Sequence, residues 1–260
     1  MKYSIVGPDV SFYQDDKDTA KAIDFHAMKA GGARYVIIRA GQNLWEDRVF
    51  DVSWRNSKGV LPRGCYWFFD SRVDPKFQAK KWLQCFDDPQ DLGELEMWCD
   101  FEDTYGGKFG GWKNWFDFME ELKRLEPKVR LGIYTGYHYW REHTIAKSIS
   151  KASLNYFAQY PLWIAAYNNV GPSVPAPWAD WKLWQFTDNG DGTRFGVESL
   201  NIDLNYFRGE EADFQEWISG FKEPPTEPTE PEAKPKPILK SVVLSMSDNS
   251  ELKLINNKES

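Results

Sequence analysis

The sequence predicts an α/β fold, an irregular (β/α) barrel with about five βα units followed by three strands. Two observations carry this prediction. Eight short apolar runs rich in strand-forming residues lie between residues 6 and 207, and helical patterns alternate only with the first five of them. Several runs are apolar almost without interruption, which is typical of strands buried on both faces of a parallel sheet.

The eight expected strands are bounded by stretches rich in polar residues, Gly and Pro. They lie at Val6–Tyr13, Tyr35–Ala40, Gly64–Phe69, Glu96–Phe101, Arg130–Thr135, Leu162–Tyr167, Lys182–Thr187 and Leu200–Phe207.

Five helices are expected between the early strands, because apolar residues recur there with helical spacing. Asp74 followed by Pro75 is a cap and first-turn pair that marks the start of the third helix. The helices are expected over residues 20–30, 50–58, 75–86, 112–119 and 138–149. The segments that separate the last three strands show no such pattern.

A change of composition near residue 222 predicts three segments. Residues 1–221 form the expected barrel, and residues 222–237 are a Pro-, Glu- and Thr-rich linker. Residues 238–260 form a short β-rich tail, interpreted either as one β-hairpin or as the first strands of a truncated wall-binding module.

Composition restricts the function classes. The net charge is −7, and no basic run is present, so general affinity for nucleic acid is not expected. Thirteen Trp and an aromatic content of 16% favour either core packing or a surface for sugar rings. Three sparse cysteines do not indicate a disulfide framework, and Cys65 and Cys99, which lie inside apolar runs, are expected to be buried thiols. No apolar leader or long apolar run is seen, so neither a signal peptide nor membrane insertion is expected.

Acidic residues fall at the ends of predicted strands, where barrel enzymes place their catalytic groups. Asp9 lies in the first strand, Asp100 and Glu102 end the fourth, and Asp203 lies in the eighth. Side chains two apart on a strand face the same side, so Asp100 and Glu102 are expected to share one cleft. Such a pair suits glycosidic cleavage, in which one carboxyl donates a proton and the other stabilises positive charge at the sugar.

The strand sequences jointly resemble those of the glycoside hydrolase family 25 muramidases, which include Chalaropsis-type lysozymes and phage endolysins. The resemblance spans about residues 5–208 in order. The matching segments are Gly7-Pro8-Asp9-Val10-Ser11, Tyr35-Val36-Ile37-Ile38-Arg39-Ala40-Gly41, Trp98-Cys99-Asp100-Phe101-Glu102, Leu131-Gly132-Ile133-Tyr134-Thr135, Pro161-Leu162-Trp163-Ile164-Ala165, Trp184-Gln185-Phe186-Thr187 and Ile202-Asp203-Leu204-Asn205.

The resemblance implies a lysozyme activity that cleaves the β-1,4 bond between N-acetylmuramic acid and N-acetylglucosamine in peptidoglycan with retention. Glu102 would be the general acid/base, and Asp100 would assist the substrate's acetamido group or act more directly on the sugar. Asp9 and Asp203 would complete the acidic floor. No cofactor and no metal are expected, since the carboxylates lack the regular loop spacing of a Ca²⁺ site.

Side chains near strand ends are expected to bind the sugars. They are Tyr66, Tyr134, Trp163, Tyr167, Trp184 and Gln185. The third strand departs from the family, because it carries Trp67 where a histidine is usual. That departure puts in doubt any role that the family gives to the histidine.

Two other functions remain open at this stage. A chitinase-like glycosidase would need a D-x-D-x-E pattern, which Trp98 interrupts. A non-catalytic wall-binding protein would explain the Trp content but not the four acidic residues. The expected partner is the peptidoglycan glycan strand, with homo-oligomerisation through the tail as a further expectation. An endolysin would wait in the host cytoplasm before its release to the wall.

Overall fold

The computed structural model describes residues 3–15, 19, 21–103, 108–220, 241–245 and 251–255. The chain divides into two compact units, Met1–Phe221 and Lys222–Ser260.

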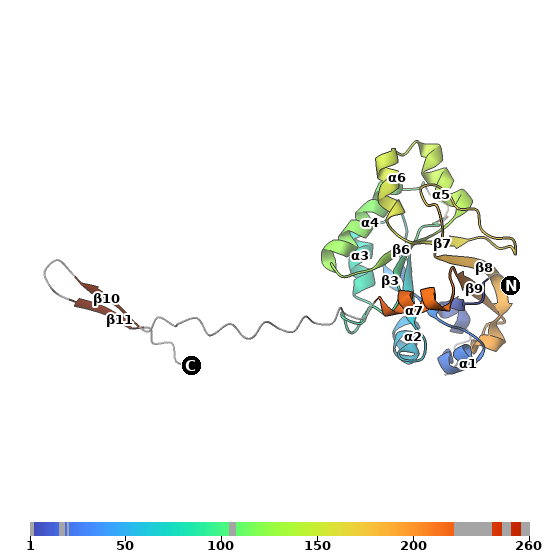
Figure 1. Ribbon diagram of the computed structural model, residues 1–260, viewed down its shortest axis with the longest axis horizontal. Helices are drawn as coiled ribbons and strands as arrows, with labels where there is room; N and C mark the ends of the chain where they lie inside the picture. Colours follow the sequence, from blue (N-terminus) through green and yellow to red (C-terminus); the bar gives the residue numbers. More distant parts are fainter. Residues whose placement is uncertain are drawn as a thin grey trace. The chain divides into compact units, whose positions relative to one another are not determined.

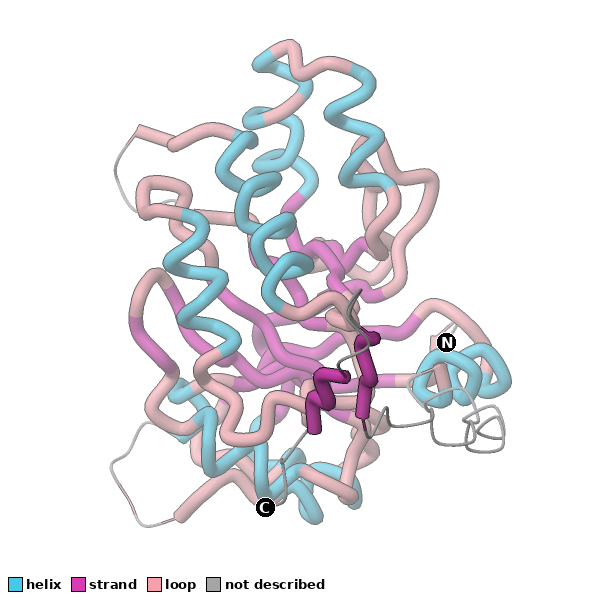
Figure 2. Tube along the Cα trace, turned by 90° about the vertical axis from the view of Figure 1, so that its left-hand side faces the viewer, coloured by secondary structure: helices cyan, strands magenta, loops and turns pink. Residues whose placement is uncertain are grey.

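The first unit is built around a closed barrel of eight strands, which confirms the predicted fold (Figures 1 and 2). The strands are β1 (Val6–Val10), β2 (Val36–Gln42), β4 (Arg63–Phe68), β5 (Met97–Asp100), β6 (Leu131–Gly136), β7 (Leu162–Ala165), β8 (Leu183–Asp191) and β9 (Asn201–Phe207). The short β3 (Trp45–Glu46) adds to the edge of β2. Apart from β3, which pairs antiparallel with β2, the strands from β1 to β8 run parallel around the barrel, whereas β9 is antiparallel to both β8 and β1.

Alternation along the strands separates an inner and an outer apolar core. Tyr35, Ile37, Trp98, Trp163 and other residues form one buried cluster, and they share the strand parity of the acidic residues. Residues of the opposite parity pack outward against the helices in a larger cluster. The acidic side chains therefore stand on a floor of bulky side chains, and the barrel interior is filled rather than open.

Helices cover the outside of the barrel (Figure 1). They are α1 (Phe25–Ala30), α2 (Phe50–Ser57), α3 (Pro75–Leu83), α4 (Trp112–Leu125), α5 (Tyr137–His143), α6 (Lys151–Ala158) and α7 (Glu211–Ser219). The predicted cap of α3 is confirmed, since the Asp74 carboxylate accepts from the amides of Lys76 and Phe77.

The expected fifth helix over residues 138–149 is wrong in its extent. The helix α5 ends at His143, and Ser148 adopts φ +54°, a left-handed conformation that a continuous helix cannot contain. A new helix, α6, then begins after Ser150, whose hydroxyl caps the amide of Ser153. The helix α7 was not predicted either. It packs Phe214 and Trp217 onto the inner cluster near the start of β2.

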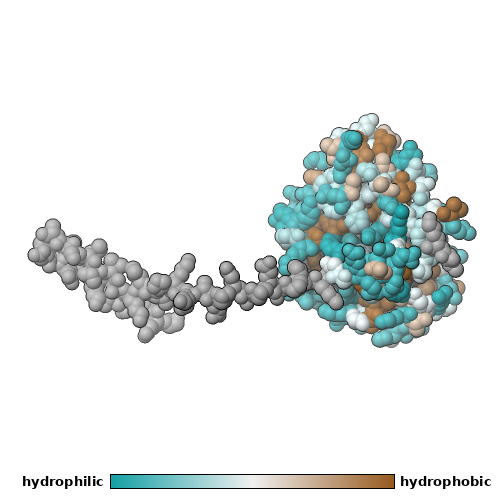
Figure 3. Space-filling view, in the orientation of Figure 1, coloured by the Kyte–Doolittle hydropathy of each residue, from teal (hydrophilic) through white to brown (hydrophobic). Residues whose placement is uncertain are grey.

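Hydrophilic side chains dominate the face of the molecule seen in Figure 3, and hydrophobic ones gather there only in small patches. None of the helices in the described residues is long and apolar enough to cross a membrane. The three cysteines are free and buried, which was expected for Cys65 and Cys99.

In the second unit, β10 (Ser241–Ser245) and β11 (Glu251–Ile255) pair antiparallel, with Ser241 opposite Ile255 and Ser245 opposite Glu251. The expected linker over residues 222–237 lies outside the described residues.

Candidate active site

A cavity of about 230 Å³ opens at the carboxyl ends of the parallel strands. Its walls carry nine of the ten residues that the sequence predicts for the site. The lining residues are Asp9, Ser11, Tyr13, Gln14, Arg39, Tyr66, Phe68, Asp100, Glu102, Tyr134, Trp163, Tyr167, Gln185 and Asp203.

Asp100 and Glu102 reach the cavity together because β5 keeps its alternation past its last residue. The Phe101 amide donates to the Tyr134 carbonyl at 2.9 Å, which continues the pairing with β6. Phe101 itself is fully buried in the outer cluster, stacked on Trp115. The residues on either side of it therefore point inward, as the spacing of the two acids predicts.

Asp203 reaches the same floor by a different route from the one expected. The strand β9 is antiparallel, so its early residues, and not its last ones, lie at the cavity end of the barrel. Asp203 pairs in register with Asp9 of β1. The expectation that catalytic groups follow the carboxyl ends of strands thus places Asp203 correctly but for the wrong reason.

Burial raises the pKa of both residues of the acidic pair. The pKa of Glu102 rises to about 7, chiefly by loss of water and with a smaller contribution from Asp9, while hydrogen bonding to Tyr134 opposes the rise. The pKa of Asp100 is held well above its usual range, first by burial and then by the charges of Glu102 and Asp9. The Asp100 Oδ1 atom is buried and has no hydrogen-bond partner among the described residues.

Asp9 and Asp203 behave as a second pair. Asp9 Oδ2 accepts from the side-chain amides of Asn205 at 2.8 Å and Gln185 at 3.0 Å, which favours its carboxylate. Burial still raises the pKa of Asp9 to about 6. The pKa of Asp203 rises to about 8 by burial, by the charge of Asp9 and by a hydrogen bond to it. Burial and mutual repulsion of the two carboxyls thus favour the retention of a proton by the pair.

The Gln185 side chain connects the tyrosines to the acidic floor. Its Oε1 accepts from the hydroxyls of Tyr134 at 2.8 Å and Tyr167 at 3.0 Å, while its Nε2 donates to Asp9. Trp163 donates its indole N–H to Asn205 Oδ1 at 2.7 Å. Each of these side chains has a fixed orientation before any substrate arrives, which is what a pre-organised site requires.

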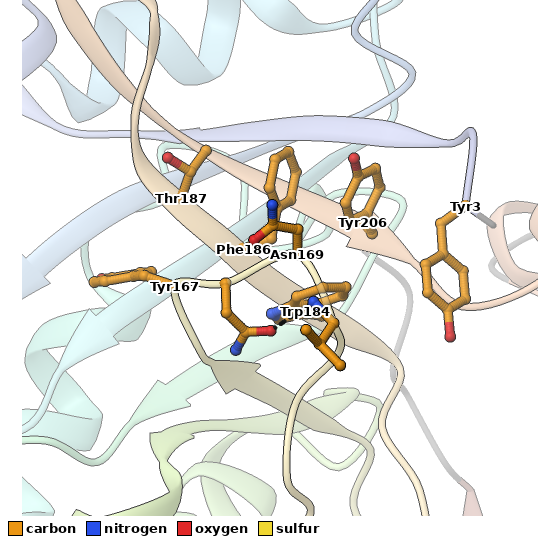
Figure 4. A pocket seen from close by; sticks show the side chains of 9 residues that line it. Tyr3, Tyr167, Asn169, Trp184, Phe186, Thr187 and Tyr206 are labelled. Carbon is orange, nitrogen blue, oxygen red and sulfur yellow. Dashed lines mark hydrogen bonds between the residues drawn. The ribbon is translucent and has the colours of Figure 1, made fainter. Parts of the chain in front are cut away.

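Trp184 is the one predicted site residue that lies outside this cavity. It neighbours Gln185 on β8 and therefore faces the opposite side of the strand. Its indole N–H donates to the Ala166 carbonyl, and the ring borders a separate hollow of about 550 Å³ on the outside of the barrel (Figure 4). The two hollows share Tyr167.

Sequence reasoning missed several lining residues, above all Arg39. The signal for Arg39 was present, because a single charge interrupts an otherwise apolar strand. Asn205 was missed as a positioning residue, although it stands two places after Asp203 and so shares its face. The remaining missed lining residues are Ser11, Tyr13, Gln14 and Phe68.

Trp67, which replaces the usual family histidine, does not face the cavity. Its neighbours Tyr66 and Phe68 do, and the indole of Trp67 stacks outward on Trp82 with ring centroids 6.1 Å apart. The substitution therefore changes the packing between the barrel and α3. In the described part of the chain, no group of three His, Cys, Asp or Glu residues is arranged to hold a metal ion.

Comparison with known proteins agrees with this architecture. YegX of Escherichia coli O157:H7 is 29% identical over 237 residues, which cover 86% of this chain and 76% of YegX. The crystal structure of the bacterial lysozyme from Streptomyces coelicolor superposes with a TM-score of 0.66 at 22% identity, covering 84% of this chain and 97% of that one. The CTP1L endolysin gives a TM-score of 0.63 at 20% identity and covers 83% and 70%.

The sequence pattern described as Glycosyl hydrolases family 25 matches residues 8–193, most of the barrel. The resemblance predicted from the strand sequences is confirmed, and the protein is a glycoside hydrolase. The chain belongs to glycosyl hydrolases family 25.

Proposed function

We propose that this protein is a lysozyme that cleaves the β-1,4 bond between N-acetylmuramic acid and N-acetylglucosamine in peptidoglycan, with Glu102 as the general acid/base. One observation carries the assignment of Glu102: it lines the cavity beside the fully buried Asp100 but is itself only half-buried, and burial raises its pKa to about 7, so that it can hold a proton for the sugar. A general acid must hold its proton at the working pH and stand next to a group that tolerates positive charge at the sugar.

Asp100 suits a role toward the 2-acetamido group of the sugar. Its buried Oδ1 lacks a partner in the described residues and can accept the acetamido N–H. The acetamido oxygen then bonds to the anomeric carbon as the glycosidic bond breaks, and Glu102 gives its proton to the leaving oxygen. Water, deprotonated by Glu102, opens the cyclic intermediate, so that two inversions give net retention.

The other predicted site residues surround Asp100 and Glu102, and they hold one another in position. Asp9 and Asp203 keep Gln185 in place, and Gln185 in turn holds the hydroxyls of Tyr134 and Tyr167. Tyr66 packs edge-on against Trp163, with ring centroids 6.1 Å apart. These aromatic side chains offer flat faces and hydroxyls to a sugar ring. We assign no contact with the bound sugar in the cavity to Trp184.

The alternative functions have less support. In a chitinase-like site a carboxyl would precede Asp100 by two residues, but Trp98 stands there, fully buried in the inner cluster. A protein that only binds the wall does not require carboxyls that are buried away from water and whose pKa values are raised as a result. The partner is the glycan strand of the wall. An endolysin role, with the enzyme held in the host cytoplasm until release, accompanies the proposal and agrees with the similarity to the CTP1L endolysin.

The test is Glu102→Gln, measured as loss of turbidity of purified cell walls. We expect turnover to fall at least about a hundredfold with the fold intact, since general acid catalysis contributes that much or more. Glu216→Gln is the matched control, because Glu216 is exposed on α7 at the other end of the barrel. Near-normal clearing by a folded Glu102→Gln protein would refute the assignment.

The products of the same digest test the bond and the stereochemistry. Mass spectrometry is expected to find N-acetylmuramic acid at the new reducing ends, and NMR of the first product is expected to show the β-anomer. Reducing-end N-acetylglucosamine would contradict the bond assignment, and an α-anomer would contradict retention.

A further inference from the structure

The cavity contains a cation that the mechanism above does not use. Arg39 of β2 is 5% exposed, although it lines the cavity. Its Nε donates to Asp47 Oδ2 at 2.8 Å, and Asp47 is 1% exposed. Arg39 is the only cationic side chain among the lining residues that the structure describes.

The guanidinium of Arg39 is held rigidly but is not saturated with hydrogen bonds. Its central carbon lies 4.7 Å from the ring centroid of Phe12, 5.4 Å from that of Tyr13 and 5.3 Å from that of Trp45. Within the described residues its Nη2 is buried without a partner. A buried donor of this kind is unfavourable unless a ligand completes it, and a held, planar fork is the geometry that binds carboxyl oxygens.

Asp47 cannot rotate away to release Arg39. Its two oxygens also accept the backbone amides of Phe12, at 3.1 Å, and Val49, at 3.1 Å. The aspartate thus anchors the guanidinium by one nitrogen and leaves the other two directed elsewhere. The carboxyls of the cavity repel an acidic substituent, so Arg39, the one cation among the described lining residues, is the side chain best suited to accept it.

We propose that Arg39 is the receptor for the 3-O-lactyl group of the muramic sugar, binding its carboxyl oxygens and so distinguishing this sugar from N-acetylglucosamine. The two sugars differ only in that substituent, and only it supplies a carboxyl group, either as a free carboxylate or as the amide to which a stem peptide is joined. This inference rests on the proposed function and deepens it. Its consequence is that wall glycan binds more tightly than chitin-type glycan of the same length.

The experiment is a binding titration in the Glu102→Gln background, in which no hydrolysis disturbs the measurement. Two tetrasaccharides are compared: one alternates N-acetylglucosamine with peptide-free N-acetylmuramic acid, and the other contains only N-acetylglucosamine. Arg39→Gln is expected to weaken the first about tenfold or more, as loss of a charge-assisted hydrogen bond does, and to change the second less than about threefold. Arg48→Gln is the matched control, because Arg48 also stacks on Phe12, at 5.1 Å, but does not line the cavity.

A second variant separates recognition from a general effect of charge. Arg39 also lowers the pKa of Asp100, so loss of its charge alone would affect both ligands. Arg39→Lys keeps the charge beside Asp47 and loses the fork, and it is expected to lose the preference for the lactyl ligand while the chitin-type ligand binds as before. Thermal unfolding will show whether Arg39→Gln folds. If it does not, the comparison of the two ligands is made with Arg39→Lys alone.

The proposal is overturned if both ligands weaken equally, or if Arg39→Lys and Arg39→Gln leave the preference unchanged. A muramic ligand whose lactyl carboxyl carries an alanine amide tests the two forms of the substituent, and it too is expected to lose affinity in Arg39→Gln. If wild-type protein clears walls while the Arg39 variants keep their preference, the proposed function stands and only the role of Arg39 falls.

Discussion

Single carboxyl groups on the cavity floor differ in what already binds them. Asp9 receives two amide N–H groups, whereas the buried Oδ1 of Asp100 receives none from the described residues. The first is stabilised as a charge by the protein itself. The second reaches a comparable state only when a substrate N–H arrives. The floor therefore holds one carboxyl whose charge the protein already stabilises by hydrogen bonds, and one whose buried oxygen gains a hydrogen-bond partner only when the ligand binds.

The raised pKa of Glu102 has a consequence for stability. Its folded-state pKa of about 7 exceeds the ordinary 4.5. The folded protein binds this proton more tightly, so the contribution is full below the unfolded value and is lost as the pH rises through about 7. Glu102→Gln cannot ionise and is expected to be more stable than wild type at pH 8 by about 1–3 kcal/mol, with the two converging at pH 4.

The measurement is thermal or denaturant unfolding of both proteins between pH 4 and pH 8. Glu216→Gln, on an exposed position, is expected to show no pH-dependent difference from wild type. If wild type were instead the more stable of the two at pH 8, Glu102 would be charged and favourably bound in the folded protein.

Nine of the ten residues predicted for the site line one cavity, and the alternation of side chains along a strand explains the exception. Gln185 and Trp184 were both expected in the cleft, and consecutive residues on a strand cannot share a face. Arg39 was visible as a charge in an apolar strand, but its partner Asp47 lies eight residues further on, beyond the end of that strand, where the alternation of the strand no longer applies. Spacing within one strand is readable, whereas contacts made after the chain has turned back are not.

Among the elements, β1 depends on close approach by a neighbouring ring. A Cβ built on Gly7 would lie 2.5 Å from two ring carbons of Tyr35. That ring cannot move aside easily, because Tyr35 is fully buried and its hydroxyl donates to the Asn205 carbonyl at 3.1 Å. The absence of a side chain at Gly7 thus allows the ring of Tyr35, part of the inner cluster, to pack directly against β1 beneath the acidic floor.

Gly7→Ala is expected to destabilise the protein by about 1–3 kcal/mol, the range for overpacking in a filled core. The check is chemical denaturation. Gly136→Ala serves as the control, since nothing lies within 4 Å of its Cβ position and its φ of −92° suits alanine, so that variant is expected to be neutral or slightly stabilised. Equal stability of Gly7→Ala and wild type would show that the Tyr35 ring can move aside to accommodate the added methyl group.

Periodicity predicted the strands better than the helices. The eight apolar, β-rich runs in the sequence correspond to the eight barrel strands. The helix α6 was missed because only Leu154 and Phe157 are buried along it, too few for a recognisable stripe. The direction of β9 was not predictable, because strand pairing is decided by tertiary contacts and leaves no mark in the strand's own residues.

For the molecule as a whole, the first unit contains every strand of the barrel and every residue of the cavity. In the second unit, β10 and β11 pair with each other as a two-stranded sheet, which is marginal alone in water. Its strands carry edges that invite further pairing. The tail is therefore expected to act in assembly or wall attachment and not in catalysis.

Deleting residues 222–260 is expected to leave the cleavage of small soluble wall fragments within about twofold of the full chain. Light scattering of both forms separates two roles of the tail. A dimer that becomes a monomer on truncation indicates pairing through the tail, whereas monomers in both cases favour part of a wall-binding module. Loss of cleavage of the small fragments would place the domain boundary elsewhere.

The pairing of β1 with β9 also sets when the cavity can first form during synthesis of the chain. Asp9 is made among the earliest residues, but its partner Asp203 and the amide of Asn205 follow almost at the end of the barrel. Contacts so distant along the chain form late. A nascent chain still on the ribosome thus has Asp100 and Glu102 without the wall that orients Gln185. The cavity is therefore completed only after nearly the whole barrel has been synthesised.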